Sequence, residues 1–346
     1  MDSSLYTDQE AQVAHALSHF IEHPETSGAG FNELALELFA YHFDRSAPYR
    51  TLCESLDINP AFVTDITQIP AVPAGAFKKF ELTCVGHEHV ERVFYSSGTT
   101  GADRSAHYMS PAALDLYRTS LKKGFRSYFP ETQELWALAE PAETAVHSSL
   151  SFMLQELKAA RWFWDDRSGL IDALNARTQP VTLFGTAFAW VDLLDNSDTN
   201  WHLPVGTRII ETGGFKGRTR EVPRAELYEM FTERLGVPDD HCHSEYGMSE
   251  MSSQFYSTGS AGVLYAPHWL KTVIIDPLTG LEAAEGNAGL LRHYDLANLN
   301  SVFLLQTEDM GDRQDGGYRL LGRAKGAEIR GCSLTVEELW TQDKTR

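Results

Sequence analysis

The chain has 346 residues, 42% hydrophobic and 22% charged, so it can bury a sizeable core as one large domain or as two to three ordinary ones. Its 29 basic and 48 acidic residues give a formal net charge of −19, which disfavours nucleic acid or anionic lipid as a partner. We expect no membrane insertion and no secretion, because no uncharged apolar run approaches the ~18 residues of a membrane span and no basic, apolar leader precedes residue 20.

The first part of the chain is predicted to be helical. Apolar residues recur with helical periodicity over residues 8–22 and 31–44, and Ser46 is placed to cap a further short helix. Residues 65–82 form a connector, because its prolines disfavour helix. We therefore expect a helical N-terminal region over residues 1–79.

A run of small residues follows a predicted strand at residues 90–95 and precedes a helix that begins at Ser110 and Pro111. A tight turn of this kind exposes backbone N–H groups and is typical of an anion cradle, although similar runs also form plain loops. It is not a Walker-type loop, so the residues alone leave phosphate binding and a plain turn open. The run is Ser96, Ser97, Gly98, Thr99, Thr100 and Gly101, with Arg104 nearby.

Strands and helices then alternate, which predicts an α/β fold with ligand sites at strand ends. The pattern becomes β-rich from about residue 262. We expect an α/β nucleotide- and acyl-binding body over residues 80–325 and a short C-terminal tail over 326–346. The predicted strands are residues 134–140, 180–185 and 207–214, and the predicted helices are 148–164, 186–196 and 223–236.

Four later stretches carry polar motifs. Residues 243–251 contain a Tyr-Gly-x-Ser-Glu pattern, and residues 211–218 place two glycines directly after a strand. Residues 306–313 contain Thr-x-Asp, and residues 320–331 contain Gly-Arg-x-Lys. Each motif alone has an ordinary structural interpretation as a core aromatic, a solvated charge or a turn residue.

Together with residues 96–101, and in this order, these stretches resemble the core motifs of the adenylate-forming superfamily. The resemblance implies the large N-terminal domain of those enzymes, with a β-rich C-terminal part, and it implies ATP and Mg²⁺ as cofactors. Residues 96–101 would surround the triphosphate. Glu250 would be a catalytic residue that holds Mg²⁺.

The resemblance also implies roles for the remaining motif residues. The backbone at Gly213 and Gly214 would lie against the adenine, Tyr246 would stack on it, and Ser249 would touch the α-phosphate. Asp309 would bind the ribose hydroxyls, with Arg323 nearby. Arg104 stands where the family usually has a lysine, Glu245 where many relatives have asparagine, and Glu308 where a glycine is common. The implied ATP-binding set is Ser96, Ser97, Gly98, Thr99, Thr100, Gly101, Arg104, Gly213, Gly214, Glu245, Tyr246, Gly247, Ser249, Asp309 and Arg323.

After the Gly-Arg-x-Lys segment, superfamily members usually continue into a mobile lid domain with a catalytic lysine, which we expect this chain to lack. Gly326 stands in place of the acidic hinge residue. The shortened layout, with "RGCSL" at residues 330–334, resembles the acyl-protein synthetases of bacterial bioluminescence. In that family a cysteine near the C-terminus accepts the acyl group, which implies Cys332 here. Read without the resemblance, Cys332 is a small buried hydrophobe.

The expected function is therefore ATP-dependent activation of a carboxylic acid, with a fatty acid favoured, and transfer of the acyl group to Cys332 for an acyl reductase partner. The alternatives are a shortened aryl- or acyl-CoA (or carrier-protein) ligase, related to phenylacetate-CoA ligases, and a non-catalytic nucleotide-binding subunit. The four cysteines have no framework pattern, which favours free thiols and a cytoplasmic location. Residues 84–89 and 241–243 contain possible zinc ligands without the paired pattern of a structural site.

Overall fold

The computed structural model describes residues 3–24, 26, 30–97, 104–131, 133–213, 220 and 222–324, with side chains from residue 8. The chain divides into two compact units, each built from separate stretches of sequence. Unit 1 comprises Met1–Gly124, Met248–Ser253 and Ala266–Arg346. Unit 2 comprises Phe125–Gly247 and Gln254–Tyr265. The boundaries that we predict at residues 79 and 325 stay predictions.

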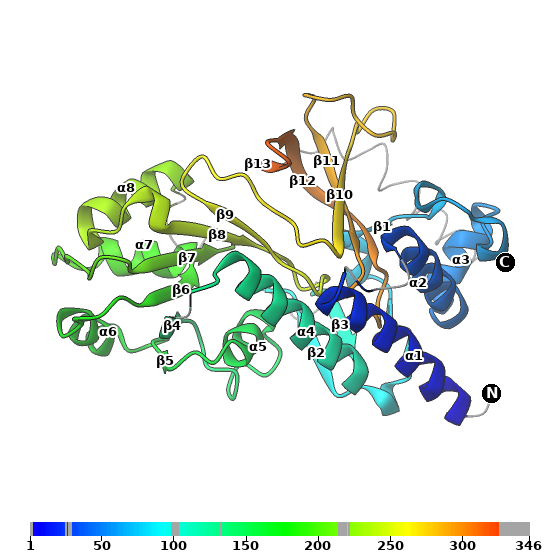
Figure 1. Ribbon diagram of the computed structural model, residues 1–346, viewed down its shortest axis with the longest axis horizontal. Helices are drawn as coiled ribbons and strands as arrows, with labels where there is room; N and C mark the ends of the chain where they lie inside the picture. Colours follow the sequence, from blue (N-terminus) through cyan, green and yellow to red (C-terminus); the bar gives the residue numbers. More distant parts are fainter. Residues whose placement is uncertain are drawn as a thin grey trace. The chain divides into compact units, whose positions relative to one another are not determined.

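Unit 2 is built on a six-stranded sheet in the order β5-β4-β6-β7-β8-β9 (Figure 1). All neighbours are parallel except β8 and β9, which are antiparallel. Parallel strands place their carboxyl ends at one edge of the sheet, where ligand sites occur in α/β folds. The strands are β4 (Leu135–Leu138), β5 (Arg161–Trp162), β6 (Thr182–Thr186), β7 (Arg208–Thr212), β8 (Cys242–Tyr246) and β9 (Phe255–Thr258).

Both faces of this sheet are covered by helices. Alternate strand residues face opposite sides, so Leu183 and Ile209 pack in a cluster with α6, α7 and α8, whereas Phe184 and Ile210 pack in a second cluster with α5. Gly236 ends α8 in the left-handed conformation that glycine adopts without strain (φ +69°). The helices are α5 (Ser149–Glu156), α6 (Arg167–Asn175), α7 (Ala187–Asp195) and α8 (Arg224–Leu235).

Unit 1 combines N-terminal helices with a C-terminal sheet of order β1-β12-β11-β10, in which β13 also pairs with β12. Strand β1 runs parallel to β12. The pairs β10–β11, β11–β12 and β12–β13 are antiparallel. The helices are α1 (Ser3–Glu22), α2 (Phe31–Arg45) and α3 (Ala47–Ser55), and α4 (Pro111–Tyr128) starts in this unit. The strands are β1 (Val72–Pro73), β10 (Leu270–Ile275), β11 (Gly289–Asp295), β12 (Leu304–Gln314) and β13 (Gly317–Arg323).

The strand expected at residues 90–95 and the helix expected from Ser110 and Pro111 are confirmed as β2 (Arg92–Tyr95) and α4, but the strand between them, β3 (Ala106–Met109), was not predicted. It pairs antiparallel with β2. One prediction of secondary structure was wrong. The helix predicted over 148–164 ends at Glu156, since Lys158 takes a left-handed conformation (φ 62°) and the chain turns into β5. No glycine marks that turn. The helices expected near the N-terminus and the strands after residue 262 are confirmed.

In the part of the chain with described coordinates, no helix combines the length and apolar character needed to cross a bilayer.

A buried carboxylate ties distant parts of unit 1 together, and this yields a stability prediction. Glu10 on α1 accepts hydrogen bonds from Ser110 Oγ (2.6 Å) and Asn300 Nδ2 (2.7 Å). Substitution Glu10→Ala should lower the free energy of unfolding by about 2–4 kcal/mol, because two buried donors lose their partner. Urea denaturation would measure it. The exposed neighbour Asp8→Ala is the control and should change stability by less than about 0.5 kcal/mol; equal effects would contradict the assignment.

Candidate functional site

In unit 1, strands β2 and β3 pair on either side of the glycine-rich run, and hydrogen bonds join the residues just beyond the strand ends. Ser96 N–H donates to the Ser105 carbonyl (3.0 Å), and Ser105 N–H donates to Ser96 Oγ (2.9 Å). Arg104 Nε donates to the Ser96 carbonyl (2.6 Å), and its guanidinium lies 5.3 Å from the centre of the Tyr95 ring. The predicted phosphate residues Gly98, Thr99, Thr100 and Gly101 lie outside the described residues.

Glu250 is a buried carboxyl group (7% exposed) in the same unit. Burial raises the pKa of this carboxyl, while Ser105, Lys78 and Arg323 act in the opposite direction. The glutamate predicted from the Tyr-Gly-x-Ser-Glu motif is therefore withdrawn from bulk water and has hydroxyl and cationic groups around it. A cation bound beside this carboxyl group would favour its ionised form, which burial disfavours.

Two side chains that sequence reasoning missed fix the backbone on which Glu250 sits. His107 Nδ1 lies 2.8 Å from the Ser249 carbonyl, and its Nε2 lies 2.9 Å from Asn298 Oδ1. Asn298 Nδ2 donates to the carbonyls of Glu250 (2.9 Å) and Val302 (3.1 Å). Both motif residues thus have their carbonyl groups held by buried side chains.

A third buried side chain fixes the residues after the motif. Asp295 accepts hydrogen bonds from Ser252 N–H (2.8 Å) and from Ser253 Oγ (2.6 Å). Burial raises the pKa of Asp295 to about 6. Trp269 Nε1 donates to Ser253 Oγ and to Ser120 Oγ, both at 3.0 Å. The sequence gives little signal for this network, because Asp295 and Asn298 lie in a stretch, residues 295–301, that mixes polar and apolar side chains.

Asp309 and Arg323 face each other across strands β12 and β13. They are register partners, and Arg323 Nε lies 3.4 Å from Asp309 Oδ1. The Asp309 side chain is 12% exposed and that of Arg323 is 73% exposed. Thr307 Oγ1 accepts the Asp309 N–H (3.1 Å), so the threonine of Thr-x-Asp holds the β12 backbone next to the carboxylate.

The structure therefore brings several of the predicted residues of unit 1 together. Ser249 Oγ donates to the carbonyl of Tyr95, at the end of β2 (3.5 Å), and the charge of Arg323 acts on Glu250. Ser97 is exposed at the start of the run. Gly214 and Cys332 lie outside the described residues.

In unit 2, the remaining predicted residues lie at the carboxyl ends of β7 and β8. Thr212 and Glu245 are register partners, and Tyr246 and Gly247 follow Glu245 directly. Gly213 is exposed with φ +70° and open space around it, a conformation that favours glycine and leaves the backbone accessible. A Cβ at Gly247 would lie 2.7 Å from Glu245 Oε1, so this glycine leaves room for the carboxyl group.

Glu245 is one of two buried carboxyl groups at this edge. Its partner Glu211, on β7, has Arg224 Nε 3.4 Å from Oε1, whereas Glu245 accepts a hydrogen bond from the Thr212 hydroxyl. Burial, together with the charge of Glu211, raises the pKa of Glu245 to about 7, and the Thr212 hydrogen bond opposes this. Burial beside a second carboxyl group thus favours the neutral form of Glu245.

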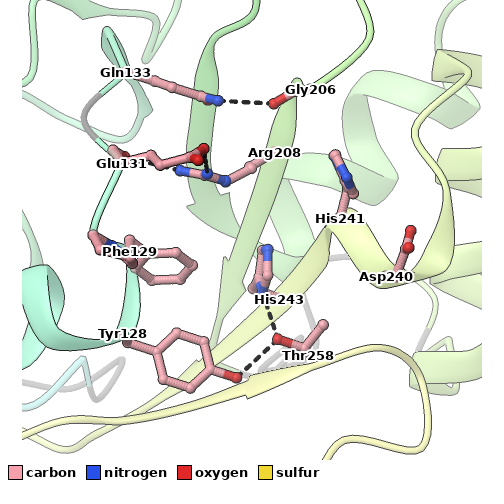
Figure 2. A pocket seen from close by; sticks show the side chains of 11 residues that line it. Tyr128, Phe129, Glu131, Gln133, Gly206, Arg208, Asp240, His241, His243 and Thr258 are labelled. Atoms are coloured by element: carbon pink, nitrogen blue, oxygen red, sulfur yellow. Dashed lines mark hydrogen bonds and ion pairs between the residues drawn. The ribbon is translucent and has the colours of Figure 1, made fainter.

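A cavity of about 400 Å³ lies at the other edge of this sheet, at the amino ends of β7 and β8 (Figure 2). His243 Nδ1 lies 3.0 Å from Thr258 Oγ1, and His241 Nδ1 lies 3.2 Å from the Thr207 carbonyl. The described residues hold no group of three or more His, Cys, Asp or Glu side chains arranged for a metal ion. The cavity contains none of the residues predicted to bind ATP.

Comparisons with known proteins agree with the motif analysis. Residues 21–111 match the family model described as "Acyl-protein synthetase, LuxE". The long-chain-fatty-acid–luciferin-component ligase of Vibrio harveyi is 22% identical over 330 residues, covering 88% of this chain and 86% of that protein. The resemblance to acyl-protein synthetases is confirmed.

Solved structures show the fold. A 2-hydroxyisobutyryl-CoA ligase in complex with 2-HIB-AMP has a TM-score of 0.65 at 14% identity, covering 84% of this chain and 67% of that one. ATP-bound MatB from Rhodopseudomonas palustris has a TM-score of 0.52 at 18% identity, covering 69% of this chain. This chain aligns with about half (49%) of the MatB chain. The predicted α/β fold of adenylate-forming enzymes is confirmed.

The carboxyl pair in unit 2 makes stability depend on pH. The Glu245 pKa rises from 4.5 to about 7 on folding, so the native state binds this proton more tightly and loses stability as pH rises through that window. Between pH 5 and pH 8, wild type should lose about 2–3 kcal/mol more stability than Glu245→Gln. Denaturant titrations at both pH values measure this. The exposed Glu229→Gln is the control and should follow wild type; a Glu245→Gln profile parallel to wild type would refute the assignment.

Proposed function

We propose that this chain is an ATP-dependent acyl-protein synthetase. It activates a carboxylic acid as acyl-AMP with release of pyrophosphate, and then takes the acyl group onto its own Cys332 as a thioester. The observation that carries the proposal is the buried Glu250 carboxylate, held by fixed backbone beside Ser105, Lys78 and Arg323. The similarity to a ligase of long-chain fatty acids supports a fatty acid as substrate.

The first step forms a bond between the acid oxygen and the α-phosphorus of ATP. The bond from that phosphorus to the bridging oxygen breaks, and the electron pair leaves with pyrophosphate. The protein contributes alignment and charge neutralisation. In this proposal Ser249 donates to the α-phosphate, while residues 96–101 and Arg104 hold the other phosphates.

Magnesium fits the donor set in unit 1. Mg²⁺ is usually bound through one or two carboxylates together with waters and substrate phosphates. Glu250 offers such a carboxylate, and the absence of a larger cluster of metal-ligating side chains among the described residues agrees with an ion that takes its other ligands from outside the protein. When bound, Mg²⁺ neutralises phosphate charge.

We assign the binding of the ribose and the adenine to carboxyl groups, one tyrosine ring and an exposed stretch of backbone. We assign Asp309, beside Arg323, to the ribose hydroxyls, because a carboxylate accepts hydrogen bonds from two neighbouring hydroxyl groups. Tyr246 is assigned to stacking on the adenine. Gly213 and Glu245 are assigned to the edge of the base, with the exposed backbone of Gly213 accounting for the glycine.

In the second step a thiolate attacks the acyl carbon, the bond from that carbon to the AMP oxygen breaks, and AMP leaves with the electron pair. Three of the four cysteines are unsuited to this attack, because Cys53, Cys84 and Cys242 are buried free thiols. Burial raises the pKa of Cys53 to about 12 and raises the pKa of the other two thiols also. Cys332 is thereby left as the proposed acceptor.

The proposed thioester also bears on the protein partner and the cellular location. An acyl thioester on protein requires a partner that consumes it, and we propose an acyl reductase that binds the acylated chain. A cytoplasmic location is proposed from the same requirement for a reduced thiol.

The magnesium assignment predicts the behaviour of Glu250→Gln. Wild type should catalyse fatty-acid-dependent exchange of pyrophosphate into ATP, and the variant should lose at least about 100-fold of that rate because the amide cannot hold the cation. Its thermal midpoint should match wild type, since the amide has the shape of the carboxyl group and keeps an oxygen that can accept a hydrogen bond from Ser105. The exposed Glu54→Gln is the control. Exchange at the wild-type rate in Glu250→Gln would overturn the magnesium assignment.

The same assay separates the alternatives. Absence of exchange with every acid in a panel would favour a non-catalytic nucleotide-binding subunit. Exchange followed by release of acyl-CoA on addition of coenzyme A would favour the shortened CoA ligase.

The acceptor assignment predicts a covalent intermediate. Incubation with labelled fatty acid and ATP should label the wild-type protein, and neutral hydroxylamine should release the label as expected of a thioester. Cys332→Ala should keep pyrophosphate exchange and lose the label. The control Cys53→Ala should keep both, because that thiol is buried with a raised pKa. Normal labelling of Cys332→Ala would reject the acceptor role.

A further inference from the structure

A short lysine-bearing segment of unit 1 has no role in the function proposed so far. The sequence "AVPAGAFKK" places strand β1 immediately before a 3₁₀ turn, Ala74–Lys78. β1 pairs in parallel with β12 at Leu305 and Gln306, and the turn packs against β3 and β12. These are the strands that carry Ala106–Met109, after the glycine-rich run, and the Thr-x-Asp motif.

Burial within this turn fixes which residues face outward. Ala76 and Phe77 are buried, whereas Lys78 is exposed. The two buried residues anchor the turn, so the Lys78 backbone has a defined position although its side chain reaches solvent. That arrangement suits a cation that meets a ligand entering from solvent.

The turn that ends at Lys78 packs against β3, and His107 on β3 lies 2.8 Å from the carbonyl of Ser249, the residue before Glu250, so Lys78 belongs to the same part of unit 1 as that carboxyl group. Lys78 has no hydrogen-bond or ion-pair partner within the described ranges. The other cations of this part of unit 1 are engaged, because Arg104 donates to the Ser96 carbonyl and Arg323 lies against Asp309. Lys78 is thus an available positive charge beside the proposed reaction centre.

The substrates make such a charge necessary. The carboxylate and ATP are both anions, and the chain itself carries a net charge of −19. Neutralisation has to come from individual cations placed at the site. We propose that Lys78 is a catalytic residue of the adenylation step, whose ammonium group contacts the oxygens around the reacting α-phosphorus.

This inference rests on the proposed function. While the acid oxygen bonds to phosphorus and pyrophosphate departs, Lys78 donates hydrogen bonds to the oxygens on which charge gathers and transfers no proton. The contact is stronger in the transition state than in the ground state, so its loss should lower kcat more than it raises KM for ATP.

The test compares two adjacent exposed lysines in acid-dependent pyrophosphate exchange. Lys78→Ala should lower kcat about 100-fold, the effect of removing one preorganised donor at a developing oxyanion, and should change KM for ATP less than about 3-fold. Lys78→Arg should recover at least a tenth of the wild-type rate. Added ethylammonium should partly restore Lys78→Ala, and Lys79→Ala should stay within about 3-fold of wild type.

Each outcome is decisive. Wild-type rates in Lys78→Ala, or an equal loss in Lys79→Ala, would overturn the catalytic role of Lys78 while the proposed function stands. A loss expressed only in KM would reduce Lys78 to a binding residue and overturn the proposal. Absence of exchange in wild type with every acid would instead overturn the proposed function. Thermal midpoints equal to wild type would confirm that Lys78→Ala is folded, as expected for an exposed side chain.

Discussion

The burial of the Glu250 carboxyl group is the constraint on which this part of unit 1 depends, because a polar group withdrawn from water needs a fixed polar environment. The carbonyls of Ser249 and Glu250 are held by His107 and Asn298, and the residues after them are held by Asp295. These hydrogen bonds satisfy buried polar groups that would otherwise be costly. Within the part of the chain that the structure describes, Glu250 makes no ion pair with another side chain at hydrogen-bond distance.

The two units differ in the charged groups that surround their buried carboxyl groups. In unit 1, the charges of Lys78 and Arg323 act on Glu250, and Arg104 donates to the Ser96 carbonyl at the start of the glycine-rich run, so several cations belong to this part of the unit. In unit 2, the buried carboxyl pair Glu211 and Glu245 lies at the carboxyl edge of a parallel sheet, and a hydroxyl group, rather than a cation, partners Glu245. A carboxyl group accepts hydrogen bonds in both forms and also donates one when it is protonated, so the raised pKa of Glu245 widens the hydrogen bonds that it can make.

The sequence allowed the fold class to be predicted, because strands and helices alternate with strong patterns, whereas the roles of the motif residues stay predictions. It did not allow the hairpin β2–β3 to be predicted, since Ala106–Met109 is short and sits between a loop and a helix cap. His107 and Asn298 were also missed, because their importance comes from contacts 142 and 48 residues away along the chain. Periodicity and local spacing report neighbours in sequence, whereas this network joins residues through tertiary packing.

The interleaving of the two units along the chain has a consequence for biosynthesis. Unit 2 ends at Tyr265, whereas unit 1 needs both its first helices and strands that follow residue 266. Glu10 meets Asn300, 290 positions later. The ribosome releases the N-terminus first, so helices α1 to α3 are synthesised long before the strands of the unit 1 sheet and lack part of their core until then. The six-stranded sheet of unit 2 is complete earlier, once Tyr265 has been synthesised. Loop closure over such separations is slow, so the order of maturation runs from the middle of the chain outward.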